Sequence, residues 1–402
     1  VAIHDRTMDK APLMLKFDAF AKNGGSAEEK ESAALLAKGK KPDEAGEMGQ
    51  AVFEKILTAD EQAIWNKQLI GEYIPVEALW QCTTCGACQQ ECPVMIEHVP
   101  AIVEMRRSLV MMEANFPPEV QPAFSNIENS FTPWAFSPAE RADWTEGTNV
   151  KTVADDPEMD VLFWVGCAGS YDDRAKRVSR AFAELMDIAG VRYRILGSEE
   201  RCTGDPARRA GNEYLADSLV KMNIETLNGY SVKKIVTTCP HCLNTFKNDY
   251  PQFGGEYEVL HHTTFIQELT ASGRLKIEGK AASPAAVAYH DSCYLGRYNN
   301  EYEAPRAAIA SVPGLTVINP KRSKDKGFCC GAGGARMFME EHDGKRVNHE
   351  RTEELLATGA GTIAVNCPFC MTMMNDGVKD NGKAEEVKVR DVAEIVLEAV
   401  KH

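Results

Sequence analysis

The chemistry of this sequence lies in its cysteines, which are grouped at spacings typical of metal ligands. The adjacent pair Cys329-Cys330 lies midway between Cys293 upstream and the segment Cys367-Pro368-Phe369-Cys370 downstream. Thiolate sulfur is a ligand for zinc and for iron–sulfur clusters. This stretch therefore predicts a metal centre.

The same layout occurs once earlier in the chain. Cys167 is followed by Cys202-Thr203-Gly204 and then by Cys239-Pro240-His241-Cys242. The first two cysteine positions are separated by 34 residues in this copy and by 35 in the later one. Thr203 stands where the later copy has the second cysteine of its pair. The chain thus contains an internal repeat built around metal-ligand cysteines, and its first copy has one thiol fewer.

A third cysteine group precedes the repeat, in the run from Cys82 to Pro93, which has the bacterial ferredoxin pattern C-x2-C-x2-C-x3-C-P. Its ligand positions are Cys82, Cys85, Cys88 and Cys92. Gly86 would let the backbone pass close to inorganic sulfide. Zinc is the competing assignment, but zinc sites usually take two ligand pairs a dozen or more residues apart. The run therefore predicts a [4Fe-4S] cluster.

Cys92 leaves two arrangements open. In two-cluster ferredoxins the cysteine before the proline ligates the other cluster, and such a run normally has a twin, which this sequence lacks. Either Cys92 completes a single cluster with the three cysteines before it, or a first run lies upstream of Val1 and contributes a further cluster. We expect the second arrangement, because a chain that begins at Val1 rather than Met is consistent with a fragment.

Composition excludes several classes of protein. A formal charge of -14 without a dominant run of Lys or Arg argues against a nucleic-acid partner. No stretch approaches the roughly 18 to 20 consecutive apolar residues of a membrane span, and no basic-then-apolar leader opens the sequence. Thirteen cysteines at ligand spacings favour metal binding in a reducing compartment over disulfides. We expect a cytoplasmic protein of two or three domains.

The elements that position the repeat cysteines are predicted to be strands alternating with helices, as in parallel α/β sheets with right-handed crossovers. Short apolar runs predict strands over 161–165, 191–196, 234–237, 286–289, 316–318 and 362–365. All nine repeat cysteines would then lie beyond the carboxyl ends of strands, where ligands gather in such sheets. In both Cys-Pro-x-Cys segments the proline marks a helix start, whose free amides and dipole favour thiolate over thiol.

The chain is predicted to have three domains. Residues 1–145 would form a helical [4Fe-4S] ferredoxin-like domain with a charged mobile loop near 27–47, and 146–283 and 284–402 would form the two repeats. Thr58 and Glu61 form a capping-box signature, and 101–112 has helical apolar spacing. Segment 116–144, rich in proline and aromatic residues, predicts an irregular connection. A second capping box is expected at Thr264 and Gln267, and a final helix over 392–400.

The histidines divide into two groups. Five are expected to be surface or helix-capping residues rather than ligands: His98, His261, His262, His342 and His349. His241 and His290 neighbour predicted ligand cysteines, so hydrogen bonding to those ligands is an alternative to a purely structural role.

Each repeat contains a cysteine, then a Cys-Cys-Gly or Cys-Thr-Gly box, and then a Cys-Pro-x-Cys segment. This double layout resembles the CCG-domain subunits of heterodisulfide reductase. It also resembles the iron–sulfur subunits of glycolate, lactate and glycerol-3-phosphate oxidation. The ferredoxin run followed by IEHVPAIVEMRRSLVMME resembles the fused form, in which a two-cluster ferredoxin precedes two CCG repeats. This form includes the soluble part of membrane-linked electron-transferring flavoprotein:menaquinone oxidoreductases.

The resemblance implies three [4Fe-4S] clusters in this chain. In the second repeat a noncubane cluster would be held by Cys293, Cys329, Cys330, Cys367 and Cys370. In the first repeat an ordinary cubane or an altered cluster would be held by Cys167, Cys202, Cys239 and Cys242. Any chemistry on a substrate would fall to Cys329 and Cys330. Glycines expected next to clusters are Gly86, Gly331, Gly333 and Gly334.

The resemblance also implies a function. The chain would be an electron-transfer oxidoreductase subunit, peripheral to the inner face of the cell membrane, linking a soluble flavoprotein or dehydrogenase to a membrane cytochrome b/menaquinone module. The alternative is a heterodisulfide or thiol reductase acting at the noncubane cluster. A third hypothesis, from another class, is a zinc-stabilised binding module without redox activity. The direction of electron flow does not follow from the residues, because potentials in this cofactor class span about -700 to +450 mV.

Metal content separates the third hypothesis from the other two. We expect anaerobically purified protein to be brown and to contain iron and acid-labile sulfide, with roughly 12 irons per chain for three four-iron clusters, or fewer if the Cys82 cluster lacks a ligand. A colourless protein that carries zinc instead would exclude the iron–sulfur assignment.

Overall fold

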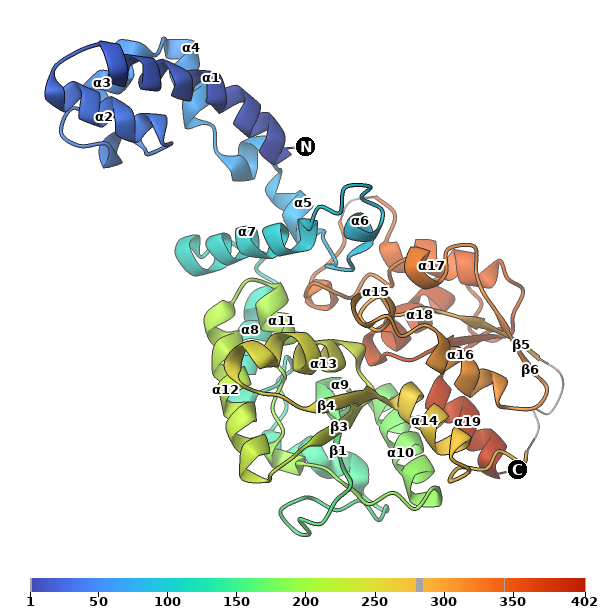
Figure 1. Ribbon diagram of the computed structural model, residues 1–402. Coiled ribbons are helices and arrows are strands. Elements are labelled where there is room, and N and C mark those ends of the chain that lie inside the picture. The colour runs from blue at the N-terminus through green and yellow to red at the C-terminus, as the bar shows by residue number, and fades with distance from the viewer. Residues whose placement is uncertain (1, 280–284, 343, 402) are drawn as a thin grey trace. The chain divides into compact units, whose positions relative to one another are not determined.

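The computed structural model describes residues 2–279, 285–342 and 344–401. The chain divides into two compact units, Val1–Trp80 and Gln81–His402 (Figure 1). The ferredoxin-type run therefore shares a unit with both cysteine repeats. The predicted domain limits at residues 145 and 283 stay predictions.

The first unit is helical. Its helices are α1 (Ala2–Asn23), α2 (Ala27–Ala37), α3 (Gly49–Ile56), α4 (Ala59–Asn66) and α5 (Val76–Trp80), with short turns η1 (Pro42–Glu44) and η2 (Leu69–Tyr73). Phe17, Phe53 and Trp65 form its centre, and the rings of Phe17 and Trp65 meet edge to face with centroids 5.3 Å apart. The predicted capping box is present, because Thr58 Oγ1 accepts from the Glu61 amide and Glu61 accepts from the Thr58 amide.

The charged stretch 27–47 was expected to be a loop, and this expectation is wrong for its first half. Residues Ala27–Ala37 form α2, whose N-cap Ser26 accepts a hydrogen bond from the Glu29 amide at 3.2 Å. Glu29 in turn accepts from the Ser26 amide at 2.7 Å. The charges lie on the outer face of this helix, while Ala33 and Leu36 are buried against the rest of the unit.

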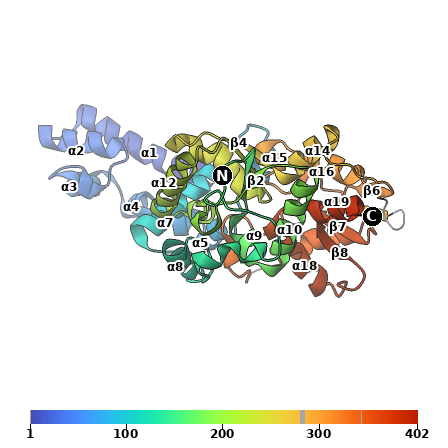
Figure 2. The same cartoon turned by 90° about the horizontal axis from the view of Figure 1, so that it is seen from below.

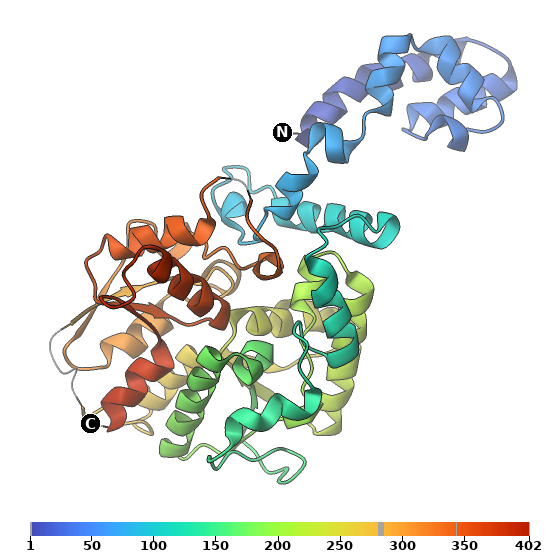
Figure 3. The ribbon, with the colours of Figure 1, turned by 180° about the vertical axis from the view of Figure 1, so that it is seen from behind.

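The second unit begins with the ferredoxin-type segment and its connection to the repeats. The helices here are α6 (Ala87–Gln90), α7 (His98–Glu113) and α8 (Val120–Ser130), followed by η3 (Pro138–Thr145). The expectation of an irregular connection over 116–144 is thus wrong for α8. Val120, Phe124 and Ile127 line one face of α8 and pack on the first repeat, where Figure 3 shows this helix alongside α12 (Glu213–Gly229). The helical pattern of apolar residues extends over only a short stretch there, and the proline and aromatic residues on either side obscure this pattern.

The two repeats have the same sheet topology, which confirms the α/β prediction. The first sheet has the order β2-β1-β3-β4 and the second β6-β5-β7-β8, with every pairing parallel. The first sheet contains β1 (Val161–Trp164), β2 (Tyr193–Arg194), β3 (Lys234–Thr237) and β4 (Glu258–His261). The second contains β5 (Ala285–Tyr289), β6 (Leu315–Ile318), β7 (Thr362–Val365) and β8 (Lys388–Asp391).

Helices and short turns connect the strands of each repeat. The first repeat has α9 (Gly166–Tyr171), α10 (Asp173–Ile188), η4 (Gly197–Glu199), α11 (Asp205–Arg209), α12, α13 (Pro240–Asn244), η5 (Thr245–Asp249), η6 (Tyr250–Phe253) and α14 (His262–Ala271). The second has α15 (Gly296–Asn299), α16 (Glu303–Ala310), η7 (Lys324–Lys326), η8 (Arg336–Phe338), α17 (Val347–Leu356), α18 (Pro368–Asp380) and α19 (Val392–Lys401).

The repeats share one hydrophobic core. Helix α10 of the first repeat lies beside α19 of the second (Figure 2), and Phe182, Ile266 and Val396 are buried in the same cluster. Arg174 of α10 forms an ion pair with Glu394 of α19 at 2.6 Å. The two repeats therefore pack against each other as one body rather than as separate domains joined by a linker.

His261 and His262 lie inside this contact and not at the surface, which corrects that part of the expectation, while His261 is the N-cap residue of α14 (His262–Ala271). They are 1% and 0% exposed, and His262 Nε2 lies 2.8 Å from Asp391 Oδ1 of the second repeat. Helix α14 starts at His262 directly after β4, and the capping box expected two residues later does not form its start. Among the described helices none combines the length and apolar character needed to cross a bilayer.

The α2 cap generates a stability prediction. We expect Ser26→Ala to cost about 1 kcal/mol, because it leaves the Glu29 amide without its acceptor. Hydrogen exchange of the α2 amides in the full chain should accelerate about fivefold. Glu31→Gln, on the exposed side of the same helix, is the control and should leave the exchange rates unchanged. Equal rates in the Ser26 variant and the wild type would mean that the cap does not hold this helix.

Candidate metal centres

The cysteines of the first repeat converge on one cavity, as expected from the strand ends. Cys167 follows β1, Cys239 is the N-cap of α13 after β3, and both line the cavity together with Cys202, Cys242 and Thr203. All four thiols are at most 9% exposed. Sulfur atoms from three separate loops therefore meet in a space largely screened from solvent.

Thr203 takes part in this site as a hydrogen-bond donor. Its Oγ1 lies 4.0 Å from Cys242 Sγ, and its side chain is 2% exposed. A neutral hydroxyl at this position adds no thiolate, so the donor set of the first repeat is four sulfurs. This composition suits a four-coordinate cluster better than one that needs five cysteines.

A buried cation supports the thiolate of Cys167. Arg141 Nη2 donates to Cys167 Sγ at 3.4 Å and pairs with Glu200 at 2.9 Å, and the arginine and glutamate side chains are 1% and 2% exposed. The hydrogen bond from Cys202, with the Arg141 charge, lowers the pKa of Cys167 to about 6. Glu200 also accepts from the amides of Val165 and Gly166, which fixes the turn after β1.

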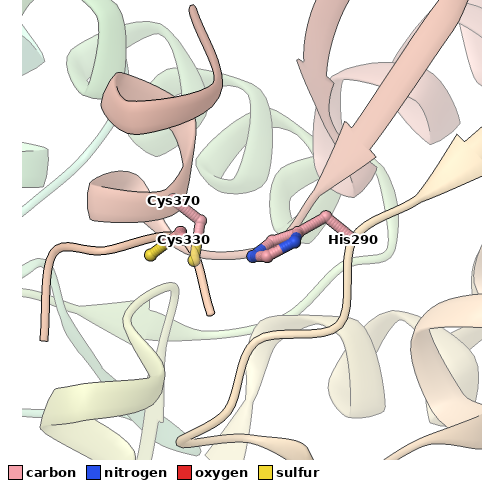
Figure 4. Close-up of side chains that lie close together, drawn as sticks. All are labelled: His290, Cys330 and Cys370. Atoms are coloured by element: carbon pink, nitrogen blue, oxygen red, sulfur yellow. The ribbon is translucent and has the colours of Figure 1, made fainter. Parts of the chain in front are cut away.

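The cysteines of the second repeat form a corresponding group. The Cys330 and Cys370 sulfurs and a ring nitrogen of His290 all lie within 4.8 Å of one another, and the His290 ring extends toward the two sulfurs (Figure 4). Hydrogen bonds from Cys329 and Cys370 hold the pKa of Cys330 well below its usual range. Burial, with the Arg351 charge, lowers the pKa of His290 to about 3, so this ring is neutral at pH 7.

The two Cys-Pro-x-Cys segments differ in the pKa of their first cysteine. Cys239 and Cys367 are both N-caps with proline at the first helical turn, as expected. Hydrogen bonds from Cys242 and Cys367 hold the pKa of Cys239 well below its usual range. Burial raises the pKa of Cys367, so desolvation outweighs the helix terminus there. Since neighbouring thiols rather than the helix start are the main cause at Cys239, a thiolate favoured by the helix start stays a prediction for both cysteines.

The ferredoxin-type cysteines are divided. Cys82, Cys85 and Cys88 lie close enough to influence one another's pKa. Cys92 accepts a hydrogen bond from the Ile96 amide at 3.4 Å. The Ile96 and Val94 amides lower the pKa of Cys92. Which cluster Cys92 would ligate stays a prediction.

Two sulfur contacts join the three groups. Cys85 and Cys329 lie close enough for Cys329 to raise the pKa of Cys85, which links the ferredoxin-type run to the second repeat. Cys367 and Cys239 likewise lie close enough to shift each other's pKa, which links the second repeat to the first. In space the second repeat therefore stands between the other two groups, although it comes last in the sequence.

Comparison with known proteins finds the same repeated domain in this chain. The family model "Cysteine-rich domain" (CCG) matches residues 161–247 and 287–375. The chain is 45% identical over 370 residues to "EtfAB:quinone oxidoreductase" of Syntrophomonas wolfei, which covers 88% of this chain and 51% of that protein. It is 42% identical over 343 residues to "Probable iron-sulfur-binding oxidoreductase FadF" of Bacillus subtilis, with 84% and 48% covered.

A third relative decides the family. The chain is 30% identical over 326 residues to a subunit of the dihydromethanophenazine:CoB--CoM heterodisulfide reductase of Methanosarcina barkeri, covering 79% of this chain and 77% of that relative. This chain belongs to the CCG-domain family of iron–sulfur oxidoreductases. It spans about half the length of the first two relatives. The resemblance predicted from the cysteine layout is thereby confirmed.

The residues present fit the iron–sulfur clusters of this CCG-domain family. The described cysteines are all free thiols, and the four cysteines of the first repeat line one cavity. The Asp205 carboxylate also lines this cavity, but it is held by His241 at 2.9 Å and by Arg209 at 3.1 Å. A Cβ on Gly166 would lie 3.5 Å from Cys242 Sγ, so glycine leaves space beside the thiols. Eight buried repeat cysteines, with the partly exposed Cys293, offer the soft sulfur donors that hold Fe–S clusters.

The glycines after Cys330 serve a contact that the sequence did not reveal. A Cβ on Gly333 would lie 2.4 Å from the Thr83 carbonyl oxygen, and one on Gly334 would lie 2.5 Å from that of Cys82. They let the ferredoxin-type loop lie directly on the second repeat. Gly86 faces the Tyr298 ring, and Gly331 has φ +100° beside Met373 and Val347. A role next to a cluster stays a prediction for all four.

Three further residues hold the ferredoxin-type loop, and sequence spacing did not predict them. Arg106, which is fully buried, donates to the carbonyl oxygens of Cys82 at 2.6 Å and Gly334 at 2.9 Å. Arg297 donates to the Cys85 carbonyl at 3.1 Å, and Tyr298 to that of Thr84 at 2.7 Å. Arg297 and Tyr298 lie far from the run in sequence and carry no motif, and although Arg106 lies in the segment that resembles the fused form, its spacing does not indicate these contacts.

The close approach at Gly334 generates a matched comparison of two glycines with positive φ. Gly334 (φ +64°) faces the Cys82 carbonyl, whereas Gly359 (φ +75°) has no atom within 4 Å of a built Cβ. Gly359→Ala should cost about 1 to 2 kcal/mol from backbone strain alone. We expect Gly334→Ala to cost distinctly more and to increase amide exchange at residues 82–84, measured by denaturant unfolding and hydrogen exchange. Equal costs would show that the loop does not depend on this contact.

Proposed function

We propose that this chain conducts electrons through three [4Fe-4S] clusters, between a soluble flavoprotein or dehydrogenase and a membrane quinone module. The observation that carries the proposal is the continuity of the sulfur contacts, Cys85 to Cys329 and Cys367 to Cys239. Three redox sites that share neighbouring ligands suit a relay, because each site has the next one directly beside it. The names of relatives that act on quinones and flavoproteins support the type of partner.

The ligands follow from the three sulfur groups. The ferredoxin-type run would offer Cys82, Cys85 and Cys88 to its cluster, with Cys92 as a further ligand. The first repeat would hold a cubane cluster through Cys167, Cys202, Cys239 and Cys242. The second would hold a noncubane cluster through Cys293, Cys329, Cys330, Cys367 and Cys370. When bound, such clusters supply reversible one-electron transfer.

The protein's own part is to bury and orient these ligands. Cys329 and Cys330 are 7% and 5% exposed and lie between the other two groups. The Arg141–Glu200 pair places a compensated charge beside Cys167 and keeps its thiolate form available for binding. Low exposure limits water at the sites. The burial of Cys329 and Cys330 favours a relay over direct reaction with a disulfide substrate, which is the alternative proposal for this pair.

We place the protein on the cytoplasmic side, against the inner face of the cell membrane. A position there would bring it to a membrane cytochrome b/menaquinone module, while the other partner stays in solution. This part of the proposal rests on the family membership and on the named quinone activity of a relative, which this chain matches over half of that relative's length.

Reduction by two donors separates the relay from the alternative. A reduced electron-transferring flavoprotein should reduce the clusters in stopped-flow experiments, whereas reduced viologen with a small disulfide should give no turnover. Steady turnover of the disulfide that is lost in Cys330→Ala would instead favour the reductase.

The Cys330→Ala variant also tests whether the sites are independent. We expect it to lose one distinctive EPR signal, that of the second repeat, and to keep the ferredoxin-type signal, because Cys330 has its sulfur contacts with Cys329 and Cys370. Thr203→Ala is the matched control in the first repeat and should retain the signal of the second. Loss of every signal in Cys330→Ala would contradict separate sites.

A further inference from the structure

His290 is a buried histidine whose outer ring nitrogen has no partner. It follows β5 three residues before Cys293 and is 1% exposed. Its Nε2 is buried and makes no hydrogen bond, although its ring lies against the sulfurs of Cys330 and Cys370 (Figure 4). An unsatisfied buried N–H or nitrogen lone pair is costly, so this atom needs a partner within the site.

Arg351 determines which ring nitrogen carries the proton. Its Nε donates to His290 Nδ1 at 3.0 Å, and the arginine side chain is 0% exposed. A guanidinium has donors and no acceptor, so Nδ1 must offer its lone pair. The proton of the neutral ring is then on Nε2, which faces the sulfurs. Arg351 is itself held by the Arg322 carbonyl at 2.8 Å and by Glu354 at 2.9 Å.

We propose that His290 donates an Nε2–H hydrogen bond to sulfur of the cluster held by the second repeat, and that Arg351 positions it for this role. This inference rests on the proposed function. It also excludes His290 as an iron ligand, because a ligating nitrogen needs a free lone pair and Nε2 carries the proton. His290 is therefore a positioning residue that tunes the cluster through its sulfur.

The expected consequence is a higher reduction potential for that cluster. Reduction adds negative charge to the sulfurs, and an N–H donor stabilises the reduced form more than the oxidised one. The first repeat differs at the corresponding position, since Trp164 stands three residues before Cys167. Trp164 lines the cavity of that repeat, and its indole N–H has no hydrogen-bond partner among the described residues. The His290–Arg351 pair thus distinguishes the second centre from the first.

Spectroscopy of the wild type tests the hydrogen bond without any variant. Protein labelled with ¹⁵N-histidine and reduced to the EPR-active state of the second repeat should show a weak ¹⁵N coupling and an exchangeable proton coupling that disappears in deuterium oxide. A strong ¹⁵N coupling of the size given by a directly bound imidazole would overturn the proposal, and so would the absence of any ¹⁵N coupling.

Redox titration of variants tests the tuning. In His290→Leu the ratio of oxidised to reduced cluster at a fixed potential should rise about tenfold, a shift of about 59 mV to lower potential for one electron. His290→Gln keeps an N–H donor and should recover part of the shift. His349→Gln changes an exposed histidine of α17, paired with Asp380, and should leave the potential unchanged.

Iron and sulfide content separates the two possible failures. Full content with an unchanged potential in His290→Leu would overturn the role of His290 and leave the relay proposal standing. A wild type without iron and sulfide would overturn the relay proposal itself. If His290→Leu fails to assemble, the His290→Gln titration and the wild-type ¹⁵N spectrum still decide.

Discussion

Convergence of thiols at the carboxyl edges of two parallel sheets is the constraint on which the rest of this structure depends. Sulfurs that will share a cluster come from loops separated by about 35 residues, and only parallel strands with helical crossovers bring such loops together repeatedly. Gathering sulfurs that carry charge inside a protein is costly. Arg141, which is buried and donates to Cys167, offsets part of that cost, and glycines such as Gly333 and Gly334 leave room for neighbouring backbone.

The sequence predicted the parts of the fold whose local pattern coincides with their environment. Strands β3 and β7 were placed with their observed bounds, since each is a short apolar run that is buried on both faces. Strands β4 and β8 were missed, because each is half polar and ends in His261 or Asp391. Those polar ends are buried because the other repeat covers them. The sequence pattern of one repeat does not indicate burial by the other.

The candidate sites show the same division. The cysteine groups could be predicted because ligand spacing is local, whereas Arg106, Arg141 and Arg351 reach their partners across the fold. Because the architecture is duplicated, the positions at which the two repeats differ show what is specific to each site. The two copies agree in strand order and diverge at single positions: Thr203 replaces a thiol that the second copy keeps, and Trp164 replaces His290. A common scaffold thus presents two chemically distinct centres.

The seating of the ferredoxin-type loop on Gly333 and Gly334 has a consequence for how the protein is made. Residues 82–85 emerge from the ribosome some 250 residues before the surface they rest on, and closing a contact of that separation is slow. Until the second repeat has folded, the cysteines among residues 82–85 are not covered by it and are accessible to oxygen and to other metal ions. Loading of the first cluster is therefore expected to follow the synthesis and folding of the second repeat.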